Sequence, residues 1–151
     1  MEKSVLLVRS SAFRTSRLAK TASALHRAGY RPSILSWKRT DKETSPPPLR
    51  ERLEDEGFPI DEVWVGEAPY ARGIWGLPKR WQYIWRVMQY VRTNDFDAVH
   101  AVDLDSALPV ALAQRIGWHT GAFVFDIADY IELYYTIPDI VARMISVVNR
   151  W

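Results

Sequence analysis

The sequence contains no cysteine and little histidine, and these two absences narrow the chemistry open to it. Its 151 residues include no Cys and three His, which are His26, His100 and His119. Without cysteine there is neither a disulfide framework nor a thiolate metal site. A structural zinc site needs four such ligands, so we expect no metal site in this chain.

Long hydrophobic runs are also missing. The apolar run that begins at Ser4 is interrupted by Arg9, which makes it too short for a signal peptide. No other window approaches the roughly 20 apolar residues that a membrane-spanning helix needs. These observations favour a cytoplasmic protein.

Glycine is sparse, and no Gly-x-Gly-x-x-Gly motif follows the first apolar run. This absence excludes the dinucleotide-binding fingerprint. The corresponding loop is rich in hydroxyl and guanidinium groups instead, and it leads into a helix. We expect Ser11, Arg14 and Arg17 to bind a phosphate or carboxylate at the start of that helix. The alternative is that Thr15 or Ser16 caps the helix while the arginines are solvated.

What is present is typical of one globular domain, with 48% hydrophobic and 25% charged residues. Apolar runs alternate with segments of helical periodicity. The expected strands are Ser4–Val8, Arg31–Ser36, Asp61–Val65, Ala98–Ala101 and a run that begins at Ala122. The expected helices are Thr15–Ala28, which ends at Gly29, and Leu49–Glu56, Pro78–Asn94, Ala107–Ile116 and Pro138–Trp151. This order predicts an α/β fold with three layers, a Rossmann-like, doubly wound and mostly parallel sheet.

Polar residues follow two of the expected strands directly. His100, Asp103 and Asp105 come at the end of one strand, and Asp126 and Asp129 at the end of the next. Ligands of open α/β sheets bind at such strand ends. Carboxylates accept hydrogen bonds from sugar hydroxyls, and imidazole both donates and accepts. We therefore predict Asp103 and His100 as catalytic residues and the other three as substrate-binding residues.

A structural interpretation of the same residues stays open. His100 is then a buried strand residue whose ring is satisfied by backbone groups. Asp105 or Ser106 is then the cap of the helix that begins at Ala107. Asp126 and Asp129 are then acceptors that hold a loop in place.

The segment from Tyr70 to Arg92 carries five Lys or Arg and no acidic residue. Its helix has an apolar stripe that we expect to face the core, formed by Leu77, Trp81, Ile84, Trp85, Met88 and Val91. Additional aromatic residues, Trp75, Tyr83 and Tyr90, lie outside or beside that stripe. Aromatic and basic residues together favour contact with anionic lipid, through Trp75, Lys79, Arg80 and Arg86. The alternative is a packed helix with solvated charges. No motif for nucleic-acid binding is present, so we expect no nucleic-acid partner.

Three stretches together resemble a known family. They are Val5–Trp37, with its strand, helix and second strand; Phe96–Leu112, similar to an Asp-hydrophobic-hydrophobic-His-Ala-His-Asp pattern; and Phe123–Asp129, similar to Tyr-Asp-Ala-His-Glu. Their order and spacing resemble the N-terminal domain of the retaining GT-B glycosyltransferases of group 1, family 4. Val102 stands where that pattern often has its second histidine.

The resemblance implies two Rossmann-like domains, the first for the acceptor and the second for a nucleotide-sugar donor, with no metal and no other cofactor. It implies a sugar acceptor that is lipid-linked or part of an envelope glycan, and peripheral attachment to the inner face of a membrane. We expect residues 1–151 to be the acceptor-side domain, incomplete at its C-terminus, inactive alone and without the donor domain. The apolar segment Pro138–Trp151 is expected to mediate a homodimer.

Two functions of another class remain open. The first is a non-catalytic Rossmann-like interaction module that docks through Pro138–Trp151. The second is a small nucleotide-binding or receiver-like domain, complete in itself. A receiver needs an acidic cluster after its first strand, whereas this chain has Arg9, Ser10 and Ser11 there.

Overall fold

The computed structural model describes residues 2–10, 16–38, 48–66 and 76–127. Strands and helices alternate throughout this part of the chain. The elements are β1 (Ser4–Arg9), α1 (Ser16–Arg27), β2 (Arg31–Lys38), α2 (Pro48–Asp55), β3 (Ile60–Trp64), α3 (Leu77–Thr93), β4 (Ala98–Val102), α4 (Leu104–Arg115) and β5 (Ala122–Asp126). Residues 138–151, for which a further helix is expected, lie outside the described residues.

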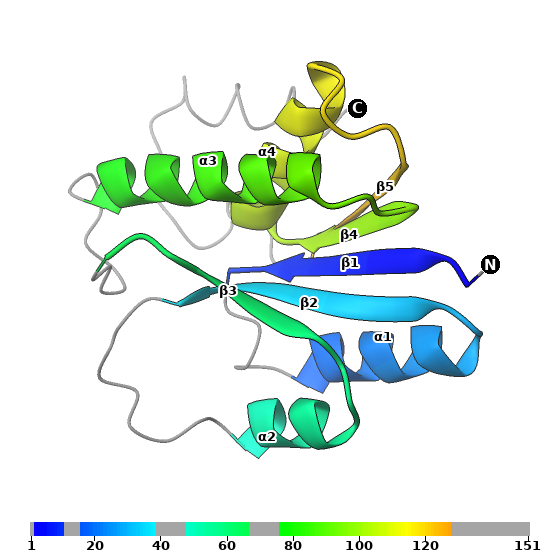
Figure 1. The fold of residues 1–151 in the computed structure, drawn as a ribbon. Coiled ribbons are helices and arrows are strands. Elements are labelled where there is room, and N and C mark those ends of the chain that lie inside the picture. Colours follow the sequence, from blue (N-terminus) through cyan, green and yellow to red (C-terminus); the bar gives the residue numbers. More distant parts are fainter. Residues whose placement is uncertain (1, 11–15, 39–47, 67–75, 128–151) are drawn as a thin grey trace.

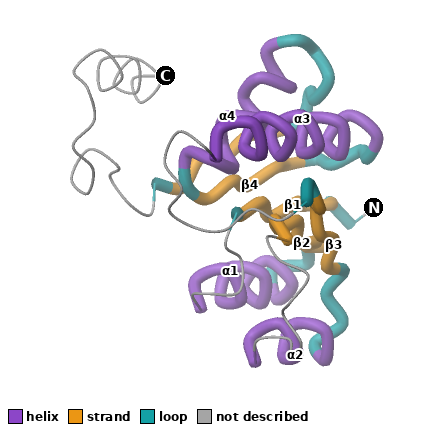
Figure 2. Tube along the Cα trace, turned by 90° about the vertical axis from the view of Figure 1, so that its left-hand side faces the viewer, coloured by secondary structure: helices purple, strands orange, loops and turns teal. Residues whose placement is uncertain are grey.

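The described strands form one parallel sheet in the order β3-β2-β1-β4-β5. Helices α1 and α2 lie on one face of this sheet, and α3 and α4 on the other (Figure 1; Figure 2). The predicted three-layer, doubly wound α/β fold is therefore confirmed. The chain leaves β1 toward β2 on one side and later returns to β4 on the other, so the strand order reverses between β1 and β4.

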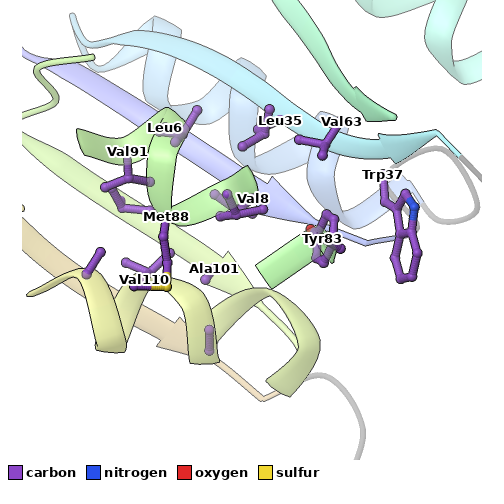
Figure 3. Close-up of a cluster of buried hydrophobic side chains, with 14 of the residues drawn as sticks. Leu6, Val8, Leu35, Trp37, Val63, Tyr83, Met88, Val91, Ala101 and Val110 are labelled. Atoms are coloured by element: carbon purple, nitrogen blue, oxygen red, sulfur yellow. The ribbon is translucent and has the colours of Figure 1, made fainter. Parts of the chain in front are cut away.

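The central strand β1 is buried on both faces, as expected for a strand covered by two helix layers. Leu6 and Val8 pack toward α3 and α4 with Leu35, Val63 and Val99 (Figure 3). Val5 and Leu7 point to the opposite face and pack against α1 and α2 with Leu18, Ile34 and Leu53. Two apolar clusters thus fix the sheet between its helices.

Helix α3 is rotated relative to the sequence prediction. Trp81 and Trp85, expected in the core, are 63% and 51% exposed, whereas Tyr83 is 1% exposed. The reason is a second apolar stripe, i, i+4, i+8, that runs through Tyr83, Val87 and Val91. The ring of Tyr83 stacks on Trp37 of β2 with 4.6 Å between centroids, and Figure 3 shows this pair at the edge of the cluster.

Two glycines allow turns that shape the sheet. Gly29, predicted to end the first helix, has φ +82° in the turn between α1 and β2. At Gly121, an added Cβ would lie 2.5 Å from the carbonyl oxygen of Phe96, so only glycine lets β5 begin so close to β4. Within the described ranges, no helix is long and apolar enough to cross a bilayer.

Candidate functional site

The candidate site lies at the carboxyl ends of β1, β4 and β5, where the strand order reverses. Parallel strands bring their carboxyl ends to one edge, and ligands of such sheets bind there. The register pairs Arg9 with Val102, and Val102 with Asp126, so the three strands end at the same level. The sequence prediction that His100, Asp103 and Asp126 share this part of the fold agrees with their placement.

An ion pair joins the ends of β1 and β4. Arg9 is 5% exposed, and its Nη2 lies 3.4 Å from Oδ2 of Asp103. A buried guanidinium is strongly unfavourable unless a negative group accompanies it, so the two side chains fix one another. Sequence analysis missed this role for Arg9. The available signal was its position directly after four buried apolar residues of a central strand.

The backbone of Asp103 adopts φ 68° and ψ 156°, a region that almost only glycine visits without strain. Its N–H donates to the carbonyl of Asp126 at 3.1 Å. Its own carbonyl accepts hydrogen bonds from the N–H groups of Ser106 and Ala107, at 3.1 and 3.0 Å. These bonds at both sides of the residue hold the strained conformation and aim its carboxylate at the sheet edge.

Helix α4 begins earlier than the sequence indicated. It starts at Leu104, with Asp103 as N-cap residue and no hydrogen bond from the side chain of that residue. The expected start at Ala107, with Asp105 or Ser106 as cap, is therefore wrong. The reason is that the unusual backbone conformation of Asp103 turns the chain. The side chain of Ser106 does not cap the helix, because it accepts a hydrogen bond from Ser10.

Ser106 joins α4 to the loop after β1. Its Oγ accepts a hydrogen bond of 2.9 Å from the backbone N–H of Ser10, and both residues are buried. A buried N–H without a partner is costly, so this bond secures the start of the loop that follows β1. The loop itself carries the predicted anion-binding residues Ser11 and Arg14, which lie outside the described residues.

A second charged cluster lies on the α1 side of the same edge. Arg17, in the first turn of α1, places Nη1 3.6 Å from Oδ1 of Asp126. Nε2 of His100 lies 3.8 Å from Oδ2 of the same carboxylate. The carboxylate of Asp126 therefore stands between a cation and an imidazole.

Burial lowers the pKa of His100 below its ordinary value of 6.5, and the carboxylate of Asp126 opposes that shift only in part. The imidazole is thus neutral near pH 7, with one nitrogen that donates and one that accepts. Within the described residues Nε2 has no hydrogen-bond partner. This nitrogen is itself buried, beside the carboxylate of Asp126.

The remaining predicted site residues either lie apart from this cluster or fall outside the described residues. Asp105 forms an ion pair with Arg80 of α3 at 3.2 Å, which ties α4 to α3. Lys79 donates to the carbonyl of Val65 at 2.7 Å. Arg86 is exposed on α3. Asp129, Trp75 and the proposed dimer segment Pro138–Trp151 fall outside the described residues.

No metal ligand set is found in the described part. Nowhere in residues 2–10, 16–38, 48–66 or 76–127 do three carboxylate or imidazole groups lie close enough together to hold an ion. Among the described residues, the edge presents two carboxylates, two guanidinium groups and one imidazole.

A doubly wound sheet with a polar edge at its reversal point defines a Rossmann-like domain. The chain belongs to the family of glycosyl transferase 4-like domains, which matches residues 15–151. This membership confirms the resemblance to GT-B glycosyltransferases found in the sequence. No curated protein matches the chain.

The solved structures that share the fold include the following two. MurG from Acinetobacter baumannii is 17% identical with a TM-score of 0.54, over 89% of this chain and 38% of that one. The C-terminal domain of a hydrogenase from Pyrococcus furiosus is 17% identical with a TM-score of 0.55, over 83% of this chain and 93% of that one. At such identities the likeness concerns the fold alone. The chain thus spans well under half the length of MurG.

Proposed function

We propose that this chain is the acceptor-side domain of a retaining glycosyltransferase. The protein that contains it would transfer a sugar from a nucleotide-sugar donor to a lipid-linked or envelope glycan. The observation that carries the proposal is the cluster of Asp103, His100, Asp126 and Arg17 at one sheet edge of a glycosyl transferase 4-like domain.

In this proposal the carboxylate of Asp103 accepts a hydrogen bond from an acceptor or sugar hydroxyl. Its buried partner Arg9 holds it in place, so the hydroxyl meets an acceptor that is already oriented. His100, as a neutral imidazole, binds a second hydroxyl from the strand side. The two residues thereby orient the attacking oxygen toward the anomeric carbon.

The transfer itself follows from the chemistry of the donor. The acceptor oxygen forms a bond to the anomeric carbon while the bond from that carbon to the diphosphate oxygen breaks. Attack occurs on the face from which the diphosphate departs, and the proton of the hydroxyl passes to the departing phosphate oxygen. No protein side chain has to act as general base. Arg17 supports the departing negative charge from the first turn of α1.

The test is a transfer assay on the protein that contains this chain. Radiolabelled nucleotide sugars are incubated with a lipid extract and an envelope extract of the producing cells, and label in lipid or polymer is counted. The proposal predicts transfer, and it predicts that Arg17→Gln raises the donor KM by about tenfold, roughly one ion pair to phosphate. The control Lys20→Gln changes an exposed cation on the same helix and should leave the KM unchanged.

The absence of transfer from any nucleotide sugar by a folded protein would overturn this function. Transfer in which Arg17→Gln and Lys20→Gln both behave as the unaltered protein would overturn the role of Arg17 alone, because the first turn of α1 would then not meet the donor.

A further inference from the structure

The side of α3 that faces away from the sheet carries three large apolar side chains in one row. Leu77, Trp81 and Trp85 are 47%, 63% and 51% exposed and follow one another at intervals of four residues. Such a row lies along a single line of a helix. We call these three residues the outer stripe. Contiguous exposed apolar surface of this kind marks an interaction site.

The outer stripe is held in a fixed arrangement. The indole of Trp85 packs against Trp118 with 5.7 Å between centroids, and the guanidinium of Arg92 lies 4.7 Å above the ring of Trp118. On the inward side, Tyr83 and Val87 anchor the helix in the core (Figure 3). The surface is therefore presented by a rigid element.

The charged side chains of α3 itself are all of one sign. Helix α3 carries Lys79, Arg80, Arg86 and Arg92 and no acidic residue. Asp105 of α4 balances Arg80, whereas Lys79 is bound to a neutral carbonyl. In the described part of the chain, Arg86 forms no ion pair. Basic residues on a helix with exposed tryptophan are typical of a segment that lies in a membrane interface.

A pocket opens next to the outer stripe, between the end of β3 and α3. Its volume is about 570 Å³, and its lining includes Trp64, Gln82, Trp85, Arg86 and Gln89. Trp85 belongs to both the pocket and the outer stripe. One guanidinium and two amide groups offer donors for phosphate oxygens, while the indoles provide apolar walls. The combination suits the headgroup of a phospholipid.

We propose that the outer stripe and this pocket form a docking face for an anionic phospholipid membrane. The indoles of Trp81 and Trp85 enter the interface between headgroups and acyl chains. The basic side chains of α3 neutralise lipid phosphates, and the pocket receives one headgroup beside Arg86. A second copy of this chain fits the face poorly, because a symmetric contact would bring the same positive charges together.

The experiment is co-sedimentation of the 151-residue chain with lipid vesicles. Vesicles of phosphatidylcholine are compared with an equal mixture of phosphatidylcholine and phosphatidylglycerol, each at low and high salt. Binding to the mixture, weakened by salt and near background on phosphatidylcholine, is the expected result. Trp81→Ser should lower the partition coefficient at least about tenfold, since a largely exposed indole loses its burial in lipid. Arg86→Gln should lower it about fivefold.

Two matched controls alter exposed residues on the far side of the sheet. Lys20→Gln removes a cation from α1, and Tyr30→Ser removes an exposed aromatic ring directly before β2. Both should bind vesicles as the unaltered chain does. Circular dichroism melts verify that every variant is folded.

Three outcomes would overturn the proposal. The first is equal binding to neutral and anionic vesicles. The second is an equal loss of vesicle binding in the variants of α3 and in the control variants. The third is a chain that ignores vesicles but self-associates until Trp81→Ser makes it monomeric. In that case the face would be a protein interface.

Discussion

The guanidinium of Arg9, buried at the end of β1, lies 3.4 Å from the carboxylate of Asp103 at the start of α4. The pair crosses the point where the strand order of the sheet reverses. Asp103 is held at the same time by a backbone conformation that glycine favours. A carboxylate fixed in both ways is preorganised, which a binding group for hydroxyls requires.

The strain at Asp103 is open to measurement through two substitutions. Asp103→Gly and Asp103→Ala both remove the carboxylate, but only glycine adopts φ 68° and ψ 156° freely. We expect the glycine variant to have a free energy of unfolding about 1 kcal/mol or more above that of the alanine variant. Urea titration compares the two. If alanine proves the more stable, the backbone of Asp103 is not strained.

The hydrogen bond between Ser10 and Ser106 is tested by removing two buried hydroxyl groups in turn. Only the loss of the Ser106 hydroxyl should lower the free energy of unfolding. Ser106→Ala leaves the buried N–H of Ser10 without its acceptor, which should lower the free energy of unfolding by about 1–3 kcal/mol. Ser36 is the control, because its buried Oγ has no hydrogen-bond partner within the described residues. Ser36→Ala should stay within about 0.5 kcal/mol of the unaltered chain. Equal effects would argue against the bond.

The orientation of α3 is tested by two aromatic residues that are two positions apart in sequence. Tyr83→Ala removes a ring stacked on Trp37 in the core and should lower the free energy of unfolding by about 3–5 kcal/mol. Trp81→Ala removes an exposed ring and should change it by less than about 0.5 kcal/mol. Chemical denaturation of both variants suffices. The reverse order would restore the orientation expected from the sequence.

His100 should make the stability of the fold depend on pH. Burial lowers its pKa below 6.5 in the folded chain, so the unfolded chain takes up the proton first as pH falls. The stability that depends on neutral His100 is complete above about pH 6.5 and is lost progressively below it. His100→Gln removes this dependence, so its free energy of unfolding should fall less than that of the unaltered chain between about pH 7 and pH 5. Parallel pH curves would mean that the pKa of His100 is not lowered.

Much of the fold follows from the periodicity of apolar residues. Continuous runs such as Val5–Val8 fit only a strand covered on both faces, and the intervening helical patterns require crossovers between parallel strands. The rotation of α3 could not be predicted in this way, because Tyr83 and Trp81 offer two apolar stripes on one helix. The stacking partner on the sheet, Trp37 of β2, decides which stripe faces the core.

The sequence indicated where the candidate site residues lie, but not which cation pairs with which carboxylate. The polar residues after the strands near Ala98 and Ala122 lie at the sheet edge that the sequence indicated. Which cation meets which carboxylate depends on the register of β1, β4 and β5, which is a contact between distant segments. For this reason Arg9 was missed. The early start of α4 escaped prediction because it depends on a backbone conformation rare for Asp103.

The central claim is that Asp103 binds a hydroxyl during sugar transfer. The most direct measurement is the kcat/KM of transfer by the Asp103→Asn variant of the protein that contains this chain, at a temperature where circular dichroism shows it folded. Asparagine keeps the size of the side chain and removes its charge. The account predicts that kcat/KM falls at least about tenfold, while the control Lys20→Gln keeps the rate of the unaltered protein. A folded Asp103→Asn protein that transfers sugar at the unaltered rate would contradict it.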